Sequence, residues 1–202
     1  SAAQVEGWRR VTEAVHAQGS CIVAQIWHVG RISHPTINGG HEPLAPSPIA
    51  PGISAYSASG RVECPVPREL DTAGIAKVVE EFRTAASNAR AAGFDGVEIH
   101  GANGYLVDQF LRDSINDRAD GYGGPIANRV RFLVEVMRAI AGEIGGGADR
   151  FEVVVVGRAV VELEAVAVEQ RREFHHVVKI VRAGRRERGV FGAVLADALT
   201  AD

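Results

Sequence analysis

The chain has 202 residues, 46% of them hydrophobic and 23% charged, which is typical of a globular protein with a sizeable core. A net charge of -3 and a pI near 6.2 offer no basic surface for nucleic acid or an anionic membrane. We therefore expect a small-molecule partner, and neither a nucleic acid nor a membrane. Cys21 and Cys64 fit no disulfide or zinc motif. Without a secretory signal, the expected location is the cytoplasm.

The first elements are a helix and a strand. Apolar residues at helical spacing predict a helix over residues 5–17, and Gly19 is a natural C-terminal stop. The β-branched run 20–27 predicts a strand covered on both faces. Roughly forty residues rich in Pro and Gly follow, and so long a loop within a compact domain is usually functional or disordered.

The middle of the chain continues this alternation. Asp71 or Thr72 is expected to cap an amphipathic helix that ends at Gly93, and "FDGVEIH" predicts the next strand. A short helix near residues 105–112, a second helix carrying apolar residues from Val130 to Ile140, and the strand "RFEVVVVG" come next. Helices that alternate with strands indicate a parallel sheet.

The fold class that this order predicts is α/β, as part of a (β/α)8 TIM barrel. No Gly-x-Gly-x-x-Gly follows any strand, which weighs against a Rossmann domain. From residue 151 the chain contains no Pro, Ser or Asn. A strand to Val156, a helix over 162–174, a strand over 177–181 and a helix over 190–199 can still be drawn through it. We therefore divide the chain into a barrel part, 1–150, and a divergent tail rich in Val and Arg, 151–202.

Polar side chains gather where two of the predicted strands end. His100 closes one strand, with Asn103 and Tyr105 just behind it, while Gln25 and Trp27 lie at the end of another. In a barrel these ends meet at the catalytic face. An imidazole N–H and an amide NH2 three residues apart can donate to one oxygen, and a phenol beyond them can supply a proton. These groups include no reductant, so the sequence implies a cofactor.

Two simpler interpretations stay open. His, Asn and Tyr at such positions are each common structural choices, because Asn tolerates left-handed backbone and Tyr packs well when half buried. A metal site built from His28, His34 and His41 is a rival, although Glu42 is the only acidic residue at ligand spacing beside them. We predict no metal. His175 and His176 adjoin on a possible strand and would face opposite sides.

Three segments carry a resemblance to a known family. "AQIWHVGRISHP", "AGFDGVEIHGANGYLVDQFLRDSINDRADGYGG" and "ANRVRFLVEVMRAI" resemble the old yellow enzymes, closest to the branch of 12-oxophytodienoate reductases. The resemblance implies a TIM barrel that holds FMN, is reduced by NADPH or NADH, and reduces the C=C bond of α,β-unsaturated carbonyl compounds. By this resemblance His100 and Asn103 would hold the substrate oxygen, Tyr105 would donate the proton, Gln25 would bind the flavin, and Trp27 would line the substrate pocket.

The resemblance also has departures. Two strands that precede this region in the family are expected to be missing, and Val154 stands where the family has a flavin-facing arginine. We therefore expect a fragment, whose oligomeric state the sequence does not indicate. The alternative function is a truncated, non-catalytic partial barrel that is unable to retain FMN.

Overall fold

A four-stranded parallel sheet forms the centre of the fold in the computed structural model, which describes residues 1–144, 152–156 and 178–181. Its strands lie in the order β1 (Val23–Ile26), β6 (Gly96–His100), β7 (Glu152–Val156) and β8 (Val178–Val181). All three neighbouring pairs are parallel. The predicted α/β class and parallel sheet are therefore confirmed.

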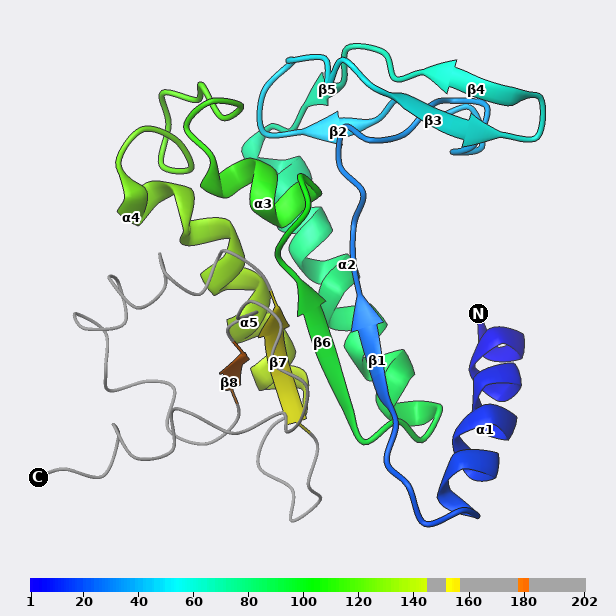
Figure 1. Ribbon diagram of the computed structural model, residues 1–202. Helices are drawn as coiled ribbons and strands as arrows, with labels where there is room; N and C mark the ends of the chain where they lie inside the picture. Colours follow the sequence, from blue (N-terminus) through cyan, green and yellow to red (C-terminus); the bar gives the residue numbers. More distant parts are fainter. Residues whose placement is uncertain (145–151, 157–177, 182–202) are drawn as a thin grey trace, which may run out of the picture.

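The helices are α1 (Ala2–His16), α2 (Thr72–Ala91), α3 (Leu106–Leu111), α4 (Ile126–Arg129) and α5 (Arg131–Ile144). The first helix precedes β1 and the others follow β1 or β6 in the sequence. The two long helices that follow β1 and β6 pack on one side of the sheet (Figure 1). The Asp71 carboxylate caps α2 by accepting from the Gly74 N–H at 2.7 Å, as predicted. Beyond the end of this helix, Gly93 takes a φ of 85°, which favours glycine.

The apolar core lies between this layer of helices and the sheet. Along β6 the side chains alternate, so Val97 and Ile99 face the helices and are fully buried. Helices α2, α3 and α5 contribute most of the other core residues, including Ile75, Val78, Phe82, Phe110, Phe132, Leu133 and Ile140. Phe110 and Phe132 stack with ring centroids 4.5 Å apart. This packing holds the strands at fixed positions and leaves the opposite face of the sheet for other groups.

The segment between β1 and α2, which we call the cap (residues 31–69), contains strands that the sequence analysis missed. Here β2 (Leu44–Ala45) pairs with β5 (Arg68–Glu69), and β3 (Ser54–Ser57) forms an antiparallel hairpin with β4 (Gly60–Glu63). The expectation of an irregular loop was therefore wrong. The hairpin turns at residues 58–59, and Gly60, the first residue of β4, takes a φ of 106°, which suits glycine. Figure 1 places the cap beyond the carboxyl ends of β1 and β6.

Two further expectations need correction. The first strand is shorter than 20–27, and within the described residues it is covered on one face only, since Val23 and Trp27 are exposed. The helix expected over Val130 to Ile140 follows a separate turn, α4, and the two are joined at Val130. Strands β7 and β8 match the strands predicted in the tail. The two tail helices, and His175 and His176, lie outside the described residues.

None of the helices in the described part of the chain is long and apolar enough to cross a membrane.

Candidate active site

The open face of the sheet carries the polar residues that the sequence analysis selected. Gln25 of β1 and Glu98 of β6 are register partners, so they lie side by side on the same face. His100 follows Glu98 by two residues and therefore lies on that face, at the carboxyl end of β6. The structure thus brings Gln25 and His100 together, as predicted, and adds Glu98, which the prediction omitted.

Hydrogen bonds connect these three side chains in a row. The Gln25 amide nitrogen donates to the Glu98 carboxylate, and the Gln25 amide oxygen lies 3.1 Å from His100 Nδ1. The other ring nitrogen, His100 Nε2, is buried and has no hydrogen-bond partner among the described residues. A buried polar atom without a partner costs free energy. An unpaired ring nitrogen at the end of a strand is therefore a sign of a ligand site.

Two aromatic rings surround the imidazole of His100. The centroid of Trp27 lies 5.7 Å from that of His100 and 4.7 Å from that of Tyr105, and the His100 and Tyr105 centroids are 5.3 Å apart. All three pairs meet edge to face, an arrangement that aromatic rings favour. His100 is only 8% exposed, whereas Trp27 is 52% exposed. The cluster therefore has a buried polar interior and one open, apolar side.

The turn after β6 holds Asn103 in an unusual backbone conformation. Its φ of 58° makes it the one non-glycine residue with positive φ in the described ranges. Asn tolerates this left-handed region better than most residues, and such outliers cluster at functional sites. The next residue, Gly104, donates its N–H to the Asp108 carboxylate at 2.7 Å. The turn is thus rigidly held, and it presents the exposed Asn103 side chain beside the start of α3.

Gln109 connects this turn to the loop that follows β1. Its amide nitrogen donates to the carbonyls of Gly104 at 2.7 Å and Val29 at 3.3 Å, and its oxygen accepts from the Arg31 N–H at 3.2 Å. Gly30 lies against this amide with a φ of 61°, and a Cβ there would overlap the Gln109 side chain. The two loops therefore behave as one unit. The sequence analysis did not select Gln109, although a glutamine on the apolar side of a short helix was a usable signal.

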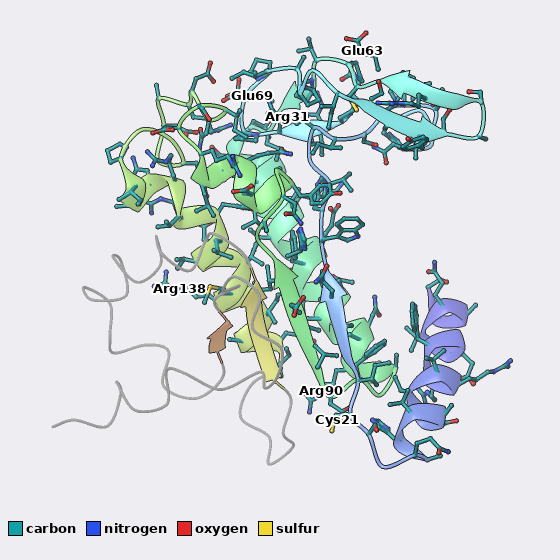
Figure 2. All side chains as sticks on the ribbon, viewed as in Figure 1. Cys21, Arg31, Glu63, Glu69, Arg90 and Arg138 are labelled. Carbon is teal, nitrogen blue, oxygen red and sulfur yellow. The ribbon has the colours of Figure 1, made fainter. Side chains whose placement is uncertain are left out.

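Arg118 joins the cap to the loop that follows α3. Its guanidinium donates to the carbonyl of Pro46 at 2.9 Å, to that of Leu70, and to the carboxylates of Glu69 and Asp120. The hydrogen bond to the Asp120 carboxylate raises the pKa of Arg118, burial opposes this shift, and the negative charges of Asp120 and Glu69 add to it. In turn, the bond from Arg118 lowers the pKa of Asp120. Figure 2 shows Glu69 and Arg31 at the cap end of the molecule, opposite Cys21 and Arg90.

Metal chemistry has little support in the described part of the chain, where no group of three or more His, Cys, Asp or Glu could hold an ion. Of the rival histidines, His28 accepts the Gly30 N–H at its Nδ1 and His34 pairs with Thr36. Burial lowers the pKa of His28, which favours the neutral ring. These contacts give both histidines a local structural role.

Comparison with known proteins identifies the class. Residues 1–183 match the model of the NADH:flavin oxidoreductase / NADH oxidase family. The chain is 47% identical over 158 residues to 12-oxophytodienoate reductase 7 of Oryza sativa subsp. japonica, an alignment that covers 74% of this chain and 39% of that protein. It is 50% identical over 143 residues to flavin oxidoreductase hxnT of Emericella nidulans, covering 70% of this chain and 36% of that protein. The chain thus spans less than half the length of these relatives.

Solved structures agree with this class. Morphinone reductase matches with a TM-score of 0.75 and 37% identity, covering 89% of this chain and 52% of that one. The old yellow enzyme homologue from Zymomonas mobilis matches with a TM-score of 0.70 and 43% identity, over 77% of this chain and 43% of that one. The fold is therefore part of a TIM barrel of the flavin oxidoreductase class. The chain belongs to the NADH:flavin oxidoreductase / NADH oxidase family, which includes the old yellow enzymes.

Proposed function

We propose that the protein is an FMN-dependent oxidoreductase that reduces the C=C bond of α,β-unsaturated carbonyl compounds, such as 12-oxophytodienoate, with NADH or NADPH. The observation that carries this proposal is the unpaired His100 Nε2, buried beside Trp27 and Tyr105 at the carboxyl end of β6. Several relatives of the chain are 12-oxophytodienoate reductases, and morphinone reductase has been solved with tetrahydroNAD. These names support the substrate class and the nicotinamide.

The residues on the open face of the sheet fit a flavin. An amide has two N–H donors and two acceptor lone pairs, and Gln25 spends one of each on Glu98 and His100. The exposed amide of Gln25 retains one donor and one acceptor, which is what the alternating polar edge of the flavin pyrimidine ring requires. Gln25 would therefore hold FMN. When bound, FMN would accept a hydride from the nicotinamide and pass it to the β-carbon of the substrate.

The chain's own residues would do the remaining work. His100 and Asn103 would hold the carbonyl oxygen and stabilise the negative charge that develops on it. Tyr105 would deliver a proton to the α-carbon as the general acid. Trp27 would cover the apolar part of the substrate, because its exposed indole lies against both His100 and Tyr105. The cap, tied down by Arg118, would limit the access of water.

The alternative, a truncated and non-catalytic partial barrel, is not favoured. The proposed binding residues lie together on rigid elements, and the family match continues to residue 183. We keep three further predictions: the cytoplasmic location, a small-molecule partner in place of nucleic acid, and the division of the chain at residue 150. Microscopy of the tagged protein tests the cytoplasmic location. Limited proteolysis of the purified chain tests the division at residue 150.

The first experiment measures whether the chain retains FMN. The protein is purified with excess FMN and desalted, and the flavin absorbance of its monodisperse peak is recorded. Stoichiometric flavin is the expected result. A colourless peak would contradict cofactor binding by this chain and would favour the non-catalytic alternative.

The second experiment separates the two half-reactions. Tyr105→Phe should slow the oxidative half-reaction by roughly 100-fold, the smaller effect expected for a general acid, and leave FMN reduction by NADPH unchanged. Tyr56→Phe, which alters an exposed cap tyrosine, is the matched control. His100→Ala and Asn103→Ala should each weaken binding of p-hydroxybenzaldehyde, a phenolic probe of the oxygen site. Equal losses in both half-reactions, or unchanged affinity for the phenol, would reject these roles.

A further inference from the structure

Gln109 of α3 carries a buried amide whose hydrogen-bond partners fix its orientation. The residue is fully buried, its amide nitrogen donates to the carbonyls of Gly104 at 2.7 Å and Val29 at 3.3 Å, and its oxygen accepts from the Arg31 N–H at 3.2 Å. Backbone carbonyls can only accept and a backbone N–H can only donate, so a flipped amide would lose all three bonds. The Gln109 side chain therefore has one orientation.

The turn that contacts Gln109 consists of residues 102–105. The Tyr105 N–H donates to the Ala102 carbonyl at 3.2 Å, and the two central residues have positive φ, 58° at Asn103 and 78° at Gly104. Positive φ at both central positions is the pattern of a type I′ turn, which favours the Asn-Gly dipeptide. The left-handed conformation costs a non-glycine residue free energy, so contacts from outside the turn are needed to hold it.

Two consecutive side chains of α3 supply these contacts at Gly104. The Asp108 carboxylate, on a residue that is 2% exposed, accepts the Gly104 N–H at 2.7 Å, and the Gln109 amide donates to the Gly104 carbonyl. The two bonds fix the peptide planes on both sides of Gly104. They therefore also fix the direction in which the Asn103 side chain leaves the turn.

The same amide joins this turn to the loop after β1. Its bonds to Val29 and Arg31 connect residues that are 80 and 78 positions away in the sequence. Between them, Gly30 has a φ of 61° and leaves no room for a Cβ beside the Gln109 amide. The loop is thus shaped to fit this side chain, and the position of the turn follows that of Arg31, the first residue of the cap.

We propose that Gln109 is a positioning residue that holds the 102–105 turn so that the Asn103 side chain reaches the substrate oxygen, and that it ties this turn to the start of the cap. The role of Asn103 rests on the proposed function, whereas the support of the turn by Gln109 does not. If Gln109 acts through Asn103, it should have no effect on ligand affinity once the Asn103 side chain is removed. A general structural role would instead lower the affinity with or without that side chain.

The first test measures amide hydrogen exchange by NMR on the full chain, without flavin or substrate. In the wild type, the Gln109 side-chain NH2 and the Gly104 N–H should exchange slowly. Gln109→Met keeps the length of the side chain but removes its donors, and it should lower the protection of the Gly104 N–H by roughly tenfold, as expected for the loss of about 1.4 kcal/mol. The Leu106 N–H, which donates to the His28 carbonyl at 3.0 Å, should remain protected. Fast exchange in the wild type, or unchanged protection in the variant, would overturn the proposal.

The second test measures the affinity of the FMN-loaded protein for p-hydroxybenzaldehyde in a double-mutant cycle. Asn103→Gly is the partner variant, because it removes the side chain and glycine accepts the positive φ. Gln109→Met should weaken binding by roughly tenfold when Asn103 is present and by less than about twofold in Asn103→Gly. Equal losses in both backgrounds would reject positioning through Asn103.

Controls separate these outcomes from other failures. Gln18→Met, at an exposed glutamine after α1, should change neither the exchange nor the affinity. Gln109→Glu keeps an acceptor for the Arg31 N–H but has no donors when ionised, so it should reproduce the effects of Gln109→Met, and it covers the case in which that variant does not fold. A chain that retains no FMN would contradict the proposed function, and the exchange measurement would still decide whether Gln109 holds the turn.

Discussion

The two faces of strand β6 show how one short segment serves both stability and chemistry. Val97 and Ile99 point into the helical layer and are fully buried, whereas Glu98 and His100 point to the open face and carry the polar row with Gln25. The apolar face depends on close packing, and the polar face depends on the direction of individual hydrogen bonds. Substitutions on the apolar face should therefore lower the stability of the fold, whereas substitutions on the polar face should alter the hydrogen bonds of the site.

The largest expected effect is on the apolar face. Ile99→Ala removes a fully buried side chain from the centre of the core and should lower the free energy of unfolding by about 2–5 kcal/mol. Urea denaturation followed by circular dichroism measures this loss. Ile53→Ala, at an exposed cap residue, is the control and should change it by less than about 0.5 kcal/mol. Equal losses at both positions would contradict the assignment of the core.

A more local loss of stability is expected where Arg118 holds the cap. Arg118→Met leaves the carbonyls of Pro46 and Leu70 without their donor, at about 1–3 kcal/mol for each buried group. The cap hairpin should then be cleaved faster by protease near its turn at residues 57–60, while the helical core resists. The exposed Arg61 provides the matched variant, Arg61→Met. Cleavage that starts in α2 instead would show that Arg118 supports the core rather than the cap.

The smallest expected effect is on the pH dependence of stability, and it concerns Tyr122, which lies in the loop before α4 and contacts Glu135 of α5. Burial, followed by its hydrogen bonds to Glu135, raises the pKa of Tyr122 from 10.0 to about 12. Because the folded state favours the neutral phenol, this stabilisation is complete below pH 10 and is lost as the pH rises through 12. Stability of the wild type should therefore fall more steeply over that range than stability of Tyr122→Phe. Parallel pH profiles of the two proteins would contradict this.

The sequence predicted the elements whose signals are local. The apolar periodicity of α2, its Asp71 cap and the strand that ends at His100 were all found, because each depends on residues close in the chain. The cap strands were missed, because strands of two to four residues in a segment rich in Pro and Gly depend on partners elsewhere. The choice of Gln25 and His100 succeeded in placing them together. Their assigned roles remain proposals.

Glu98 could have been found by the alternation of β6, which places it on the same face as His100. Its bond to Gln25 could not, because the register between β1 and β6 is set by how the helices pack behind the sheet. The sequence also could not predict the contacts of Arg118 with Pro46 and Leu70, because these contacts join segments that are 72 and 48 positions apart.

The position of Trp27 gives the chain an optical reporter. The sequence contains two tryptophans: Trp27 lies half exposed against His100 and Tyr105, whereas Trp8 contacts Phe94 at a centroid distance of 5.6 Å, on the α1 side of the molecule. A bound flavin would accept the excitation energy of the indole. The emission of Trp27 should therefore change when a ligand binds at the site.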